Sequence, residues 1–235
     1  MANDYFRFRH FTVYHDRCAM KVGTDGTLLG AWARGGQTVL DIGTGTGLIA
    51  LMMAQRFPDA TIWGIDIDSE AVGQARANVA GSPFRNIGIL EADVRTFTPI
   101  VPTACLSFDA IVSNPPYFDS SLECPDGQRT LARHTASLSY RDLMQSVCRL
   151  LADGGEFSVV IPFDCKARME AEATLAGLFK ARECAVKTTP RKQPRRYLMA
   201  FRKHPADLEL EEGVIETSPN VRSSWYQELT KDFYL

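Results

Sequence analysis

The stretch Thr38-Val-Leu-Asp-Ile-Gly-Thr-Gly-Thr-Gly-Leu-Ile-Ala50 decides the fold. Residues 38–42 read as a short buried strand, and the apolar pattern of 48–56 predicts a helix directly after the glycines. A strand, a glycine-rich turn and a helix form a nucleotide-type site. Bare backbone lets a ligand approach closely, and the helix N-terminus offers free N–H groups.

Strands and helices alternate along most of the chain. The pattern predicts further strands over 61–66, 87–92, 108–113 and 157–161, and helices over 69–79, 139–152 and 165–179. Two more strands, 181–188 and 197–202, are joined by a short connection with two prolines, which favours a hairpin. We therefore predict an α/β fold with a doubly wound sheet of seven strands, mostly parallel and ending in a reversed hairpin. The tail, 204–235, is expected to hold a short strand near Val214 and a helix from about Ser223.

The composition is that of a globular protein. The 235 residues are 45% hydrophobic and 23% charged, and no stretch has the roughly 18–20 uncharged residues of a membrane span. The first residues lack the apolar core of a signal peptide, so we expect a cytoplasmic protein. The six cysteines are too widely spaced for a zinc site or a redox dithiol, which predicts free thiols and no metal. No linker divides the chain, so we expect one domain over 1–235 and a monomer.

Three acids lie at the carboxyl ends of three successive predicted strands. Asp41 stands before the glycine loop, where a carboxylate would repel a pyrophosphate but attract the amino and sulfonium groups of S-adenosylmethionine. Asp66 ends the second strand, where an acid can accept from both ribose hydroxyls, and Asp93 follows the third strand, placed for an adenine amino group. The glycines alone decide nothing, because Gly45-x-Gly47-x-x-Ala50 would also pass as a dinucleotide fingerprint.

The fourth predicted strand is followed by Asn114-Pro115-Pro116-Tyr117. The prolines stiffen the chain and remove two donors, which leaves the Asn114 side-chain oxygen and the Pro115 carbonyl as acceptors. Such a pair can hold both hydrogens of a planar amino group and favour the pyramidal form, whose lone pair attacks a methyl group. Tyr117 offers a flat face for stacking a base. The alternative is a rigid turn after a strand.

These motifs resemble class I S-adenosylmethionine-dependent methyltransferases that act on exocyclic or amide nitrogen. The resemblance covers about residues 20–203 and implies a Rossmann-like fold with a catalytic core over 38–203. By position, it assigns Asp41, Gly43, Gly45 and Gly47 to the methionine-binding loop, Asp66 to the ribose, Asp93 to the adenine and residues 114–117 to catalysis.

The two ends of the chain resemble a narrower group within these methyltransferases. Residues 8–33 and 226–235 are similar to the ends of the bacterial enzymes that methylate N6 of the adenosine just 3′ of the anticodon in a valine tRNA. That likeness implies a tRNA substrate. It also implies that residues 1–37 cover the cofactor and the substrate, with Lys21, Gly23, Thr24 and Asp25 over the cofactor.

Basic residues gather between 180 and 204, where Glu183 is the only acid. In a parallel sheet, the turn after the sixth strand lies on the same edge as the glycine loop. We therefore expect RNA contacts from this turn and from basic residues after the catalytic motif: Arg191, Lys192, Arg195, Arg196, Arg129 and Arg133. A solvated basic loop is the alternative. The acids of the tail are expected to form a solvated edge.

Three other functions stay open. A methyltransferase for a glutamine side-chain amide uses the same Asn-Pro-Pro-Tyr logic, but such enzymes carry a helical domain before the glycine loop, and only about 37 residues precede Thr38 here. A guanine-N2 methyltransferase of ribosomal RNA often brings an extra domain. A non-catalytic RNA-binding module would have no need of Asp41, Asp66, Asp93 and Asn114.

Overall fold

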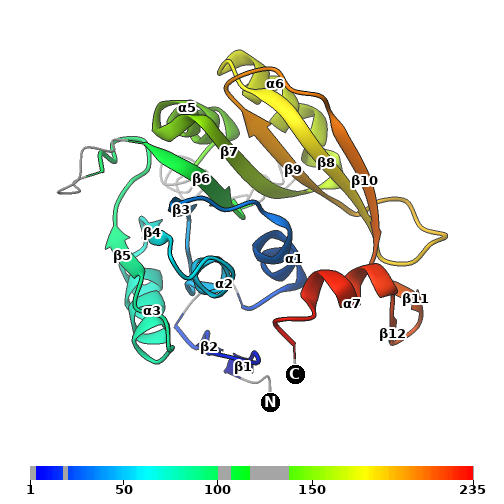
Figure 1. Cartoon of the computed structure of the whole chain (residues 1–235), viewed down its shortest axis with the longest axis horizontal. Coiled ribbons are helices and arrows are strands. Elements are labelled where there is room, and N and C mark those ends of the chain that lie inside the picture. Colours follow the sequence, from blue (N-terminus) through cyan, green and yellow to red (C-terminus); the bar gives the residue numbers. More distant parts are fainter. Residues whose placement is uncertain (1–3, 18–20, 100–106, 117–137, 235) are drawn as a thin grey trace, which may run out of the picture.

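The computed structural model describes residues 4–17, 21–99, 107–116 and 138–234. Its centre is an eight-stranded sheet in the order β10-β8-β9-β7-β6-β3-β4-β5 (Figure 1). The strands are β3 (Thr38–Ile42), β4 (Thr61–Asp66), β5 (Ile87–Glu91), β6 (Phe108–Ser113), β7 (Leu151–Pro162), β8 (Phe179–Lys187), β9 (Arg196–Arg202) and β10 (Glu209–Val214). Only β9 runs antiparallel to its neighbours, so the mostly parallel sheet with a reversed hairpin is confirmed.

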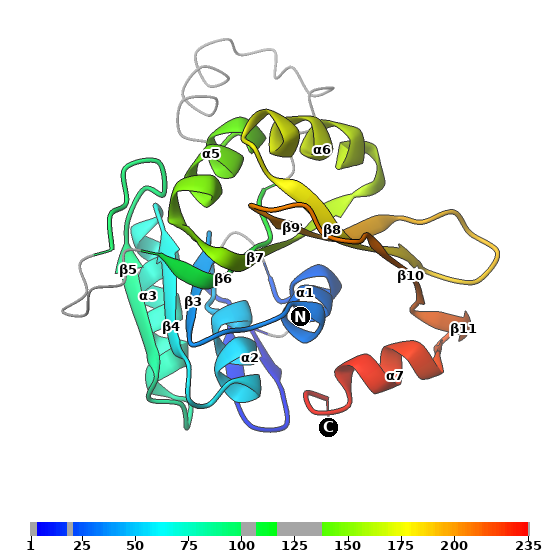
Figure 2. The same cartoon turned by 45° about the horizontal axis from the view of Figure 1, so that its top comes forward.

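Helices cover both faces of the sheet (Figures 1 and 2). One face carries α1 (Thr24–Trp32), α2 (Leu48–Arg56), α3 (Ser69–Ala80) and α7 (Ser224–Thr230), and the other carries α5 (Tyr140–Leu150) and α6 (Lys166–Leu175) after a 3-10 turn over Phe163–Cys165. The apolar side chains divide accordingly. Leu40 and Ile111 pack with α5, whereas Val39 and Val112 pack with α1 and α2. Among the described residues, no helix is both long and apolar enough to cross a bilayer.

The two ends of the chain lie together below α1 and α2 (Figure 1). The hairpin of β1 (Tyr5–Arg7) and β2 (Thr12–Tyr14) meets the residues after α7, where the Arg9 amide donates to the Phe233 carbonyl at 2.8 Å. The small pair β11 (Glu216–Ser218) and β12 (Val221–Arg222) leads into α7, which begins where the helix from about Ser223 was predicted and is capped by Ser223.

The predicted number of strands was wrong, because the strand expected near Val214 joins the main sheet as β10, parallel to β8. Its acids are not merely solvated. Glu209 accepts from Arg34, Glu211 from Trp32 and Trp225, and Glu212 from Lys187. These partners come from other segments of the chain, so the tail pattern alone could not reveal that the strand joins the main sheet.

Other helices end a few residues before the predicted positions. The helix predicted over 139–152 ends at Leu150, and β7 begins at once, with a register shift opposite Phe108–Ala110. The helix predicted over 165–179 ends at Leu175, because Gly177 adopts φ 79° and turns the chain into β8. Asp68 caps α3 by accepting from the Glu70 amide.

Candidate active site

The glycine loop connects β3 to α2 at the carboxyl edge of the sheet. Gly43, Gly45 and Gly47 have φ values of 69°, 53° and 79°, a left-handed conformation that residues with a Cβ rarely adopt. The amides of Gly43 and Thr44 donate to the Ile65 carbonyl at 2.9 and 3.0 Å, so the loop is fixed against the end of β4. The chain therefore holds bare backbone at the point where β3 ends.

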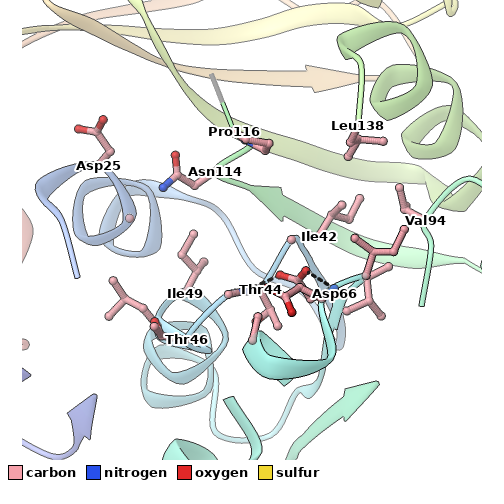
Figure 3. Close-up of a pocket in the computed structure, with 18 of the residues that line it drawn as sticks. Asp25, Ile42, Thr44, Thr46, Ile49, Asp66, Val94, Asn114, Pro116 and Leu138 are labelled. Atoms are coloured by element: carbon pink, nitrogen blue, oxygen red, sulfur yellow. Dashed lines mark hydrogen bonds between the residues drawn. The ribbon is translucent and has the colours of Figure 1, made fainter. Parts of the chain in front are cut away.

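A cavity of about 570 Å³ opens above this loop, within the roughly 300–1,000 Å³ of small-molecule sites. It lies where β3, β4 and β6 end, and the N-terminus of α1 forms one wall (Figure 3). The structure brings these predicted residues to its lining: Lys21, Gly23, Thr24, Asp25, Gly43, Gly45, Asp66, Asp93, Asn114 and Pro116. The lining also includes residues with no predicted place in a cofactor pocket, among them Arg95, Leu138 and Arg196.

Asp41 does not line the cavity, contrary to its predicted contact with a ligand. Its side chain is 0% exposed, and its Oδ2 accepts from the Thr44 hydroxyl at 2.7 Å and from the Ala50 amide at 3.2 Å. Burial raises its pKa to about 7; the two hydrogen bonds oppose that shift, and the nearby Asp66 charge adds to it. Asp41 therefore organises the loop from beneath. Gly47 does not border the cavity either, because it faces Ala75 of α3.

Asp66 and Asp93 both border the cavity, and both already hold protein groups. Asp66 Oδ2 accepts from the Gly45 amide at 2.9 Å, and its Oδ1 accepts from the Asp68 amide at 3.0 Å (Figure 3). Arg95 donates from its Nε to both Asp93 oxygens at 2.9 Å, and these side-chain hydrogen bonds lower the pKa of Asp93. Asp93 therefore enters the site as an ion pair rather than as a lone acceptor.

Asn114 stands at the end of β6. The Ser113 hydroxyl donates to the Ile42 carbonyl at 2.9 Å, which joins β6 to β3 just before the motif. Asn114 and Pro116 line the cavity, and Figure 3 places Asn114 between Pro116 and the first turn of α1. Pro115 is buried and does not border the cavity. Tyr117 lies outside the described residues.

The segment before α1 closes the cavity opposite the glycine loop. Gly23 caps the helix, and both the amide and the hydroxyl of Thr27 donate to its carbonyl. Asp25 forms an ion pair with Arg196 at 2.8 Å between Oδ1 and Nε. Arg196 was predicted to contact RNA, but it is only 16% exposed and forms part of the cavity wall. Its partner lies far away in the sequence, so no local pattern could have revealed this place.

Three of the other predicted RNA contacts do not line the cavity. Arg191, Lys192 and Arg195 are exposed in the turn between β8 and β9. Because Pro162 at the end of β7 pairs with Arg196, this turn lies at the carboxyl edge of the sheet, as predicted. Arg129 and Arg133 lie outside the described residues. No cluster of three metal-ligating side chains occurs in the part of the chain that the structure describes.

The N-terminal hairpin is tied to the glycine loop through α3. Asn78 is 2% exposed, and its side-chain amide donates to the carbonyls of Tyr14 and Thr46 at 2.8 and 2.9 Å. Its oxygen accepts from the Tyr14 amide at 2.9 Å. This contact was not predicted, because the sequence does not distinguish a buried Asn from an exposed one in a helix that mixes polar and apolar residues.

Known proteins that are similar to this chain are methyltransferases by name, which agrees with the geometry of the site. Residues 33–204 match the family described as "Methyltransferase domain". A protein of Phocaeicola vulgatus named tRNA1(Val) (adenine(37)-N6)-methyltransferase is 50% identical, with 100% of this chain and 99% of that protein covered. A protein of Pseudoalteromonas translucida with the same name is 41% identical, with 98% of each covered.

Solved structures support the fold. A predicted O-methyltransferase from Agrobacterium tumefaciens superposes with a TM-score of 0.66 at 21% identity, covering 89% of this chain and 96% of that one. The chain therefore belongs to the methyltransferase-domain family and, within it, to the family of full-length relatives named tRNA1(Val) (adenine(37)-N6)-methyltransferase.

Proposed function

We propose that this protein transfers a methyl group from S-adenosylmethionine to N6 of adenosine 37 in a valine tRNA. The observation that carries the proposal is Asn114, which borders the same cavity as the glycine loop and Asp66. Relatives that match this chain from end to end carry the name of that activity. In this proposal the protein acts in the cytoplasm as a monomer, and tRNA is its substrate and partner.

The residues of the cavity fit S-adenosylmethionine. A Cβ on Gly43 would meet no protein atom within 4 Å, so the loop leaves room for a ligand against its backbone. The buried Oδ1 of Asp41 has no hydrogen-bond partner among the described residues, which suits a nearby cationic ligand. Asp66 would accept from the ribose and the Asp93–Arg95 pair would flank the adenine, while Lys21 to Asp25 would cover the methionine end. When bound, the cofactor supplies an electrophilic methyl group on its sulfonium.

The chain's own groups would act on the adenine amino group. Conjugation with the purine delocalises the nitrogen lone pair and makes this amine a poor nucleophile. The Asn114 side-chain oxygen would accept one of its hydrogens and favour the pyramidal nitrogen. Pro115, whose carbonyl the sequence predicts as the second acceptor, does not border the cavity in this structure. The methylated nitrogen is acidic and loses its proton without a strong base, so orientation and electrostatics supply most of the catalysis.

The decisive experiment offers labelled S-adenosylmethionine to the purified protein with total tRNA, ribosomal RNA and release factors in parallel. We expect label in tRNA, recovered after nuclease digestion as N6-methyladenosine. Label in N2-methylguanosine or in a protein glutamine would contradict the proposal.

Asn114→Ala tests the assigned centre. Loss of the acceptor that borders the cavity should lower kcat by about 10²–10³-fold, while cofactor affinity stays close to that of the wild type. Calorimetry with S-adenosylmethionine is the control, because an unfolded variant would lose binding as well. A fully active variant would remove Asn114 from the mechanism.

A further inference from the structure

A second cavity, of about 730 Å³, lies beside the first and belongs to no function assigned so far. Both ends of the chain form it, together with the start of α1, and we call it the terminal groove. Its lining residues are Phe6, Arg9, Val22, Gly23, Thr24, Thr27, Arg222, Tyr226, Gln227, Thr230, Lys231 and Tyr234. Figure 1 shows α7 near α1, with β1 below them.

The terminal groove shares a wall with the proposed active site. Val22, Gly23 and Thr24 line both cavities, so a single segment of chain separates them. A nucleotide strand whose target base enters the first cavity therefore has its neighbouring nucleotide within reach of the groove.

The charged residues that line the groove are all basic, although the whole chain has a net charge of −2. Arg9 is exposed, and its side chain has no ion-pair partner among the described residues. Lys231 pairs with Glu228 at 2.6 Å and Arg222 with Glu216 at 3.2 Å, and both cations are at least half exposed, so solvent weakens these pairs. A phosphate can therefore compete for these cations.

Aromatic rings complete the groove. Phe6 is 38% exposed and lies edge-on to Tyr234 with ring centroids 5.9 Å apart. The hydroxyls of Tyr226 and Tyr234 lie 2.9 Å apart and hydrogen-bond to each other, so their positions are fixed. Basic side chains beside an accessible aromatic ring are the combination that binds single-stranded nucleic acid, because cations hold the backbone and the ring stacks on a base.

We propose that the terminal groove binds the nucleotide next to the target adenosine, with Arg9 and Lys231 on its phosphate and Phe6 against its base. The inference rests on the proposed function and deepens it, because a target base splayed out of its loop leaves flanking nucleotides that need a site of their own.

The test compares Arg9→Ala/Lys231→Ala with the charge-matched control Arg85→Ala/Lys203→Ala. The control residues precede β5 and follow the reversed strand β9, so they lie at the opposite edge of the sheet from the active site. Fluorescence anisotropy with the substrate tRNA over a range of KCl concentrations gives affinity and salt dependence. We expect the groove variant to lose about ten-fold in affinity and to lower the salt slope by roughly 0.7, the value for one phosphate of a single strand, against little change in the control.

A second series tests the stacking position. Phe6→Ala should raise KM for tRNA with little change in kcat, and Phe6→Trp should restore it, because any large ring can stack. Equal tRNA affinity in the groove variant and the control, or a Phe6→Ala enzyme with unchanged KM, would overturn the inference. The proposed function would survive that result if wild-type protein still forms N6-methyladenosine, and it would fail only if it does not. Affinity for S-adenosylmethionine should be the same in every variant.

Discussion

Asp41 shows how a single buried carboxylate couples folding to pH. Its pKa is about 7 in the folded chain and 3.8 in the reference state. Because the folded pKa is raised, the group's contribution to stability is full below pH 3.8 and is lost as the pH rises through 7.

Asp41→Asn removes that titration while keeping an oxygen that can accept from Thr44 and Ala50. Between pH 5 and pH 8, the free energy of unfolding of the wild type should fall by about 2–3 kcal/mol relative to the variant. Urea unfolding at the two pH values measures the difference. Parallel pH dependence of the two proteins would mean that Asp41 does not change its protonation in this range.

Asp66 has two roles, because its carboxylate holds the glycine loop and is also the proposed acceptor for the ribose. Asp66→Ala removes the acceptor of the Gly45 amide, so affinity for S-adenosylmethionine should fall by about 10- to 100-fold. The control is Asp59→Ala, an exposed acid before the other end of β4, which should bind normally. Calorimetry that finds equal affinity in both variants would count against the role of Asp66.

At the scale of elements, the sequence predicted boundaries best for helices and strands whose own hydrophobic pattern marks where they begin and end. Residues 48–56 and 108–113 form α2 and β6 with the predicted boundaries. The sequence did not place β10 in the main sheet because acids dominate this strand, and its partners include Trp32 of α1 and the strand β8. The glycine loop and Asn114 were recognisable from local order, whereas the places of Arg196 and Asp41 depend on contacts made after folding.

Glu156 holds the reversed end of the sheet together. It is 5% exposed on β7 and accepts from Arg182 on β8 at 2.9 Å and from Arg202 on β9 at 2.7 Å. Arg182 also lies over the Trp32 ring at 3.9 Å, which extends the cluster to α1.

Glu156→Ala would leave Arg182 buried without its main counter-charge, so the free energy of unfolding should fall by about 3–5 kcal/mol. Glu212→Ala breaks an exposed pair with Lys187 and should cost under about 1 kcal/mol. Chemical denaturation of both variants makes the comparison. Similar small losses would mean that the buried cluster adds little to the stability of this sheet.

At the scale of the molecule, the chain concentrates its proposed chemistry on one edge of the sheet. The glycine loop, Asn114, the start of α1 and the turn between β8 and β9 all lie there. That turn carries Arg191, Lys192 and Arg195 in exposed positions, whereas Arg196 is held by Asp25. The turn can therefore be tested for RNA contact without disturbing the cavity.

Arg191→Ala/Lys192→Ala/Arg195→Ala should weaken tRNA binding and reduce the salt slope by about one for each phosphate that the turn no longer neutralises. Cofactor affinity should not change, because none of the three lines the cavity. Arg196→Ala provides the contrast, since it breaks the pair with Asp25 and should disturb cofactor binding instead. Anisotropy titrations over a range of KCl concentrations distinguish the two effects. A triple variant with the wild-type slope would make the turn a solvated loop, and tRNA would then approach the site from the side of α1.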